Sequence, residues 1–233
     1  MPAPSATDRL SQIQTQWSAI LQPDSLEVAG TVQSQLLMRY AGAVYRYLLV
    51  VAKNEDVASD LAQEFAYRFL RGDFRSADPS RGRFRDFVKR SVVNLAMDHF
   101  RRVKHRAQLE SPESIEDSEM GAEEEWQKAF DRSWRQEVLE RTWQRLESSQ
   151  DQWTVLRSRA RHADVNSMEL SEHVSKQLGR DVSADWTRQT LSRARTKFAE
   201  LLRIEVAESL GGADTETVDD ELSRLGLLKY VAR

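Results

Sequence analysis

Glycine and proline are scarce in this chain, and their scarcity limits the possible folds more than any other feature. The sequence has 9 Gly and 5 Pro among 233 residues, about half of the average combined usage. Both residues interrupt helices and are common in turns between strands. No segment alternates apolar and polar side chains for long, as a half-buried strand would. The sequence therefore predicts an all-α protein.

Several chemistries are excluded or disfavoured by composition. The chain has no Cys, which excludes disulfides, thiolate zinc sites and cysteine nucleophiles and favours a cytoplasmic location. The 4 His residues fall in no metal-binding spacing, and no phosphate-binding glycine loop is present. The strongly apolar run at 48–52 is far too short to cross a membrane. We therefore expect no cofactor, no metal, no membrane span and no enzymatic activity.

The net charge of −3 conceals an alternation of basic and acidic segments. Residues 68–106 carry 12 Arg and Lys against 4 Asp, and residues 155–203 carry 10 bases against 6 acids. Between them, residues 107–125 hold 8 acids, no bases and few large apolar side chains, a composition typical of a solvated tether. A second acidic segment, 204–223, has 7 acids and no bases. This alternation predicts two small helical domains joined by an acidic flexible linker.

The predicted organisation has five parts: an N-terminal extension over 1–29, a first helical domain over 30–106, the linker over 107–136, a second helical domain over 137–207 and an acidic C-terminal extension over 208–233. The tail from 204 ends in apolar residues, among them Leu225, Leu227 and Leu228. Two interpretations stay open for it, a regulatory or partner-docking segment and simple packing against its own domain.

Two helices of the first domain have a polar face beside an apolar one. Apolar spacing predicts a helix over 36–51 and another after Asn54, a plausible N-cap. The outer face of that second helix carries Asp60, Gln63, Glu64 and Tyr67. After a predicted loop at 71–83, a third helix has a polar stripe made of Arg90, Asn94, Asp98 and Arg101. Such stripes indicate either contact surfaces or ordinary solvated faces.

Further on, Trp126, Phe130, Trp134, Val138 and Leu139 suggest another amphipathic helix whose aromatic residues pack in a core.

Residues 166–202 have the pattern of a helix-turn-helix. Asn166 and Ser183 are placed as N-caps of the two helices, and Gly179 is placed to end the first. The outer face of the second helix carries Arg188, Gln189, Ser192, Arg195 and Thr196. Arg and Gln can pair with guanine and adenine edges in the major groove, so this face is predicted to read DNA. A solvated surface is the alternative.

Three segments resemble bacterial RNA polymerase sigma factors of the extracytoplasmic-function class. DLAQEFAYRFLRGDF at 60–74 and GRFRDFVKRSVVNLAMDHFRR at 82–102 resemble conserved region two, and LSRARTKFAELL at 191–202 resembles the end of region four. The ending ELSRLGLLKY resembles tails found on a subgroup of environmental bacterial sigma factors.

The resemblance implies a dissociable subunit that binds core RNA polymerase, recognises promoter DNA as duplex and as single strand, and assists melting. It assigns polymerase binding to Asp60, Gln63 and Glu64. It assigns the minus-ten element to Phe74, Arg75, Arg90, Asn94, Asp98, Arg101 and Arg102, and the minus-thirty-five element to Ser183, Arg188, Gln189, Ser192, Arg193 and Arg195. An anti-sigma factor is a further candidate partner. The alternative function is an autonomous helix-turn-helix regulator that binds operator DNA without polymerase.

Overall fold

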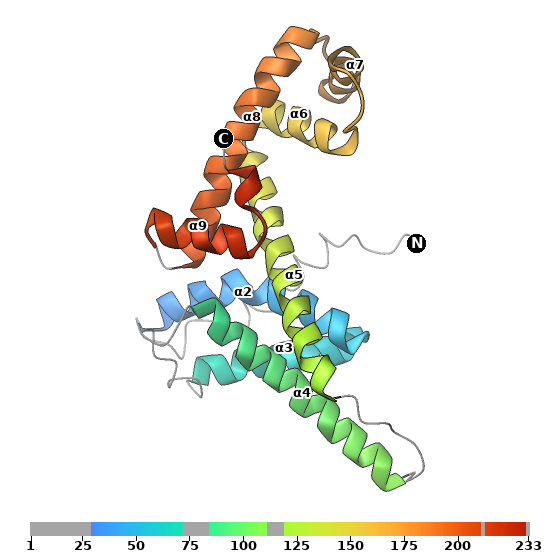
Figure 1. Cartoon of the computed structure of the whole chain (residues 1–233), viewed down its shortest axis with the longest axis vertical. Helices are drawn as coiled ribbons and strands as arrows, with labels where there is room; N and C mark the ends of the chain where they lie inside the picture. Colours follow the sequence, from blue (N-terminus) through green and yellow to red (C-terminus); the bar gives the residue numbers. More distant parts are fainter. Residues whose placement is uncertain (1–28, 72–83, 111–118, 211–212, 232–233) are drawn as a thin grey trace. The chain divides into compact units, whose positions relative to one another are not determined.

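The computed structural model describes residues 29–71, 84–110, 119–210 and 213–231. No strand occurs among these residues, so the prediction of an all-α protein is confirmed for them (Figure 1). The helices are α2 (Ala29–Ala52), α3 (Glu55–Arg71), α4 (Phe84–Glu110), α5 (Glu119–Leu146), α6 (Gln150–Arg161), α7 (Ser167–Leu178), α8 (Ala184–Ser209), α9 (Thr215–Arg224) and the short 3-10 helix η3 (Leu228–Tyr230). The chain divides into two compact units, Met1–Glu137 and Val138–Arg233.

The core of unit 1 is formed by the apolar faces of α2, α3 and α4. Its buried side chains include Tyr40, Val44 and Leu48 from α2, Leu61, Phe65 and Phe69 from α3, and Val88, Val92 and Leu95 from α4. The predicted break between the first two helices is present, because α2 ends at Ala52 and α3 begins at Glu55. Asn54 caps α3 as predicted, its Oδ1 accepting a hydrogen bond from the Val57 backbone N–H at 3.0 Å.

The structure differs from the predicted linker over 107–136. Helix α4 continues to Glu110, and α5 begins at Glu119 and runs past the predicted end of the linker. The stretch that we expected to be flexible is therefore helical at both of its ends, and the division between the two units falls inside α5. Of the predicted linker, residues 111–118 lie outside the described part of the chain.

Aromatic packing holds the described part of α5 that falls within the predicted linker. The rings of Tyr40 and Trp134 stack with centroids 4.4 Å apart, and Tyr47 meets Phe130 edge-on at 5.7 Å. Phe130 and Trp134 are four residues apart, one helical turn, and both are buried. Their burial confirms the packed amphipathic helix that the aromatic spacing predicted here, and it assigns this part of the predicted linker to the core of unit 1.

Unit 2 is built around α8, which packs against α6, α7 and α9 (Figure 1). Its α6–α8 core contains the buried residues Val155, Leu170, Val174 and Leu191. The predicted caps are confirmed: Asn166 accepts hydrogen bonds from the backbone N–H groups of Met168 and Glu169, and Ser183 accepts one from that of Trp186. Gly179 ends α7 in the left-handed conformation with φ 66°.

The C-terminal extension packs within unit 2. Asp214 caps α9 by accepting a hydrogen bond from the Thr217 backbone N–H at 2.9 Å, and this bond lowers the pKa of the Asp214 carboxyl. Gly226 takes the left-handed conformation after α9, which allows the chain to turn back. The side chains of Val218, Leu222, Leu225, Leu227 and Val231 are buried. An ion pair between Arg203 and Asp219 joins α8 to α9.

Candidate polymerase and nucleic-acid interfaces

The three residues assigned to polymerase binding lie together on the exposed side of α3. Asp60, Gln63 and Glu64 are all exposed, while Leu61 and Phe65 on the opposite side are buried. Glu64 pairs with Arg68 at 2.6 Å on the same helix, an exposed pair that a partner can displace at little cost. The helix thus presents carboxylates and an amide to solvent at one face.

Tyr67 extends this polar face by one turn and was not assigned a role from the sequence. Its side chain is 57% exposed, and the Arg71 guanidinium lies 6.0 Å from the centre of its ring. An exposed tyrosine beside charged residues is typical of interface anchors. We define the α3 face as Asp60, Gln63, Glu64 and Tyr67.

A second polar face runs along α4 and contains every described residue assigned to the minus-ten element. Arg90, Asn94, Asp98, Arg101 and Arg102 are all exposed. The arginine Nε atoms of Arg90 and Arg102 donate to the backbone carbonyls of Asp86 and Asp98, at 3.3 and 3.1 Å. These bonds hold the two guanidinium groups along the helix surface. Phe74 and Arg75 lie outside the described residues.

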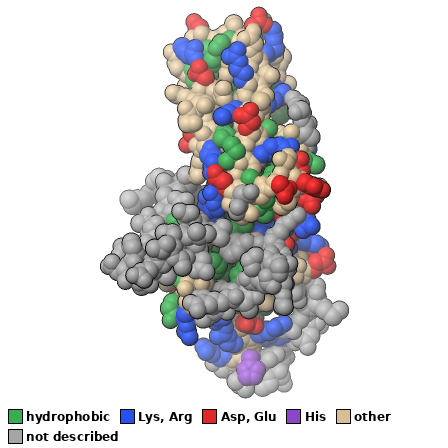
Figure 2. All heavy atoms as spheres, turned by 90° about the vertical axis from the view of Figure 1, so that its left-hand side faces the viewer, with side chains coloured by type: hydrophobic (Ala, Val, Ile, Leu, Met, Phe, Trp, Pro, Cys, Tyr) green, Lys and Arg blue, Asp and Glu red, His purple; other side chains and the backbone are tan. Residues whose placement is uncertain are grey.

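The carboxyl-terminal part of α4 is strongly basic. Arg101, Arg102 and Arg106 are exposed, and Lys104 and His105 lie between Arg102 and Arg106 in the sequence. Asp98 pairs with Arg101 at 3.9 Å. Figure 2 shows Lys and Arg side chains gathered at the lower end of the molecule, where this part of α4 lies in Figure 1. Such a row of cations can follow a phosphate backbone.

The residues assigned to the minus-thirty-five element lie at the start of α8 and along its exposed side. Arg188, Gln189, Ser192, Arg193 and Arg195 are exposed, and Ser183 caps the helix. Arg188 forms an ion pair with Asp185 in the first turn. Thr187, Leu191 and Ala194 are buried on the other side. The face of α8 that the sequence predicted to point outward is therefore exposed to solvent. It is rich in side chains that can donate hydrogen bonds to bases and phosphates.

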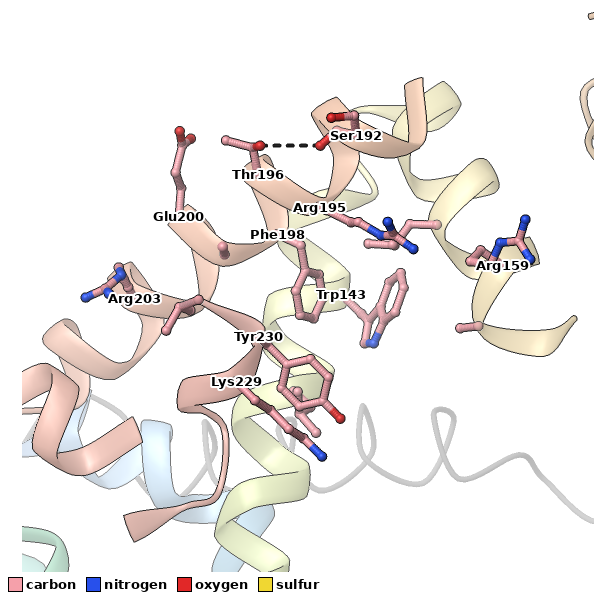
Figure 3. A pocket seen from close by; sticks show the side chains of 15 residues that line it. Trp143, Arg159, Ser192, Arg195, Thr196, Phe198, Glu200, Arg203, Lys229 and Tyr230 are labelled. Atoms are coloured by element: carbon pink, nitrogen blue, oxygen red, sulfur yellow. Dashed lines mark hydrogen bonds between the residues drawn. The ribbon is translucent and has the colours of Figure 1, made fainter. Parts of the chain in front are cut away.

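Unit 2 also has a pocket of about 810 Å³ that sequence reasoning did not find. Figure 3 shows Ser192, Thr196 and Arg195 of α8 above the rings of Phe198 and Trp143, with Lys229 and Tyr230 of the C-terminal extension below them. No sequence pattern could have identified it, because Lys229 is far from α8 along the chain and reaches the pocket only through the packing of α9.

The described residues contain neither a metal-binding cluster nor a membrane-spanning helix. No group of three or more His, Asp or Glu side chains there could hold a metal ion. None of the described helices is long and apolar enough to cross a membrane.

Comparison with known protein families gives one match, which lies within unit 1. The family model of sigma-70 region 2 matches residues 36–106, which span most of α2, all of α3 and most of α4. Neither a curated protein nor a solved structure matches the chain. The α3 and α4 faces both lie within the matched residues. Residues 36–106 are therefore similar to sigma-70 region 2, and this similarity supports a sigma factor role in promoter recognition by RNA polymerase.

Proposed function

We propose that this protein is an extracytoplasmic-function sigma factor that binds core RNA polymerase in the cytoplasm, directs it to specific promoters and assists melting. It is not an enzyme in this proposal and needs no cofactor. The observation that carries the proposal is that the region 2 match covers a domain with two exposed polar faces, on α3 and on α4. An autonomous regulator would have no use for these two faces.

The α3 face is the proposed contact with core polymerase. Its two carboxylates, Asp60 and Glu64, are exposed on a domain whose other exposed helix, α4, is basic. A basic partner surface would therefore be attracted to α3 and repelled by α4, which orients the encounter. Gln63 adds an amide that can donate and accept hydrogen bonds across the interface.

The α4 face is the proposed contact with the minus-ten element. Asn94 and Asp98, with amide and carboxylate groups one turn apart, can hydrogen-bond to the edges of an exposed base. Arg90, Arg101 and Arg102 flank them and would bind the backbone of the same strand. The outer side of α8 is the proposed contact with the minus-thirty-five duplex, which its N-terminal turns would enter through the major groove.

The first experiment measures binding of the full-length chain to core polymerase. We expect the double variant Asp60→Ala with Glu64→Ala to raise Kd at least tenfold, since loss of a charged contact at an interface costs about 2 kcal/mol or more. Glu55→Ala is the matched control, because Glu55 is an exposed acid on the same helix but on a different face. Equal affinities for the double variant and the wild type would refute the α3 assignment.

The second experiment separates melting from polymerase binding. Asn94→Ala should reduce open-complex formation on a linear promoter while core affinity stays at the wild-type value, since Asn94 is exposed on α4 and not on α3. Equal transcription from both proteins would refute the α4 assignment. A chain that binds specific duplex tightly by itself and never associates with core polymerase would overturn the proposed function and support the autonomous regulator.

A further inference from the structure

The C-terminal extension brings two exposed residues to the edge of the proposed DNA-reading helix. Leu227 and Val231 are buried and anchor η3, whereas Lys229 and Tyr230 between them are exposed. The Lys229 ammonium lies 5.1 Å from the centre of the Tyr230 ring. Both side chains line the same pocket as Ser192, Arg195 and Thr196 (Figure 3). The end of the chain thus forms one wall of a groove whose other wall is α8.

The charges in this groove favour an anionic partner. Its charged lining residues are four cations, Arg159, Arg195, Arg203 and Lys229, and one acid, Glu200. Four of these five are engaged with neighbours: Arg159 donates to backbone carbonyls, Arg203 pairs with Asp219, Glu200 pairs with Lys197 at 3.5 Å, and Arg195 also has a partner within the chain. Within the described residues Lys229 has no ion-pair partner, so its charge is available to a ligand.

Helix geometry places the Arg195 side of this groove at the level of a DNA backbone. If Arg188 and Gln189 reach base edges, Arg195 lies seven residues further along α8, or about 10 Å along the helix axis. The major groove is about 12 Å wide, so a helix that enters it by its first turns meets the flanking phosphates at about this distance. Lys229 and Tyr230 lie across the pocket from this part of α8.

We propose that Lys229 and Tyr230 extend the DNA-binding surface of α8 and contact the sugar–phosphate backbone of the same duplex. The Lys229 ammonium neutralises a phosphate, and the Tyr230 hydroxyl donates a hydrogen bond to a neighbouring phosphate oxygen. The C-terminal extension is then a part of the promoter-binding domain. This inference rests on the proposed function, because it needs α8 to bind duplex DNA.

Salt dependence of promoter binding tests the proposal. Holoenzyme is assembled from core polymerase and the full-length chain, and its affinity for a duplex promoter, selected from a randomised library, is measured between 50 and 200 mM salt, as is usual for such titrations. Lys229→Ala should lower the slope of log K against log salt by about 0.9, the value for one phosphate contact. Lys229→Arg keeps the charge and should keep the slope.

Arg224→Ala is the matched control. Arg224 is an exposed cation of the same extension that does not line the groove, so its removal should leave the slope unchanged. An unchanged slope for Lys229→Ala, or an equal loss for both alanine variants, would overturn the inference. Arg188→Ala, measured in the same assay, separates the inference from the proposed function. If Arg188→Ala abolishes promoter selectivity while Lys229→Ala leaves the slope unchanged, the inference fails and the proposed function stands. A wild-type holoenzyme without promoter selectivity overturns both.

Discussion

Replacing Trp134 with alanine tests whether the acidic segment before residue 137 is part of the folded first unit. Trp134 is 2% exposed and stacks on Tyr40, so the structure assigns it to the core of unit 1. A flexible tether over 107–136 would instead leave it in solvent, where its loss would change nothing. The two arrangements therefore predict very different stabilities for one variant.

The loss of unfolding free energy expected for Trp134→Ala follows from the burial of the Trp134 side chain. An aromatic side chain buries about 150–250 Å², and at about 25 cal/mol per Å² this corresponds to about 4–6 kcal/mol. Measured losses for tryptophan or phenylalanine to alanine in cores are about 3–5 kcal/mol, so we expect about 4 kcal/mol. With a urea m value of about 2 kcal/mol/M, the midpoint of unfolding should fall by about 2 M.

Urea unfolding of the full-length chain, followed by far-UV circular dichroism, measures this shift. Arg132→Ala is the control, since Arg132 is exposed on the same helix and should change stability by less than about 0.5 kcal/mol. Trp134→Phe should lose only about 1 kcal/mol, because the ring still packs on Tyr40 and the indole N–H has no acceptor among the described residues. A wild-type midpoint for Trp134→Ala would refute the packing of this segment in unit 1.

Three further predictions concern unit 2. Gly179→Ala should destabilise it by about 1 kcal/mol in thermal unfolding, because φ 66° is strained for alanine while the space for a methyl group is open; an unchanged melting temperature would contradict this. Leu222→Ala should cost about 2–5 kcal/mol in urea unfolding, since Leu222 is fully buried; an unaffected midpoint would show that the extension does not stabilise the unit. The lowered pKa of Asp214 means that its capping bond stabilises the folded state above about pH 4, the ordinary pKa, and is lost as the pH falls further. Asp214→Asn should therefore weaken the acid-induced drop in melting temperature, and identical pH profiles for the two proteins would contradict this.

Local features of the sequence predicted the helices and their exposed faces well. Apolar spacing identified the buried sides of α3 and α8, and Asn54, Asn166, Gly179 and Ser183 were recognised as helix ends before the structure was known. These predictions succeed because periodicity and capping depend on residues within one or two turns of each other. The exposure of Asp60, Asn94 and Arg188 follows from the same rule.

Composition alone was misleading between the two domains. The acids of 107–125 suggested a tether, and the aromatic spacing from Trp126 predicted a packed helix without showing what it packs on. Phe130 and Trp134 contact Tyr47 and Tyr40 on α2, more than eighty residues earlier in the chain. The stability of this helix depends on a tertiary core whose residues lie far apart in the sequence.

The sequence by itself determined that the described chain is helical, where α3, α7 and α8 begin and α7 ends, and which polar side chains face outward, because each of these depends on near neighbours. Only the tertiary structure decided that α5 contributes Trp134 to the first unit, and that Lys229 and Tyr230 meet Arg195 around one pocket. Those contacts join residues far apart in the sequence, and only the packing of the folded core brings them together.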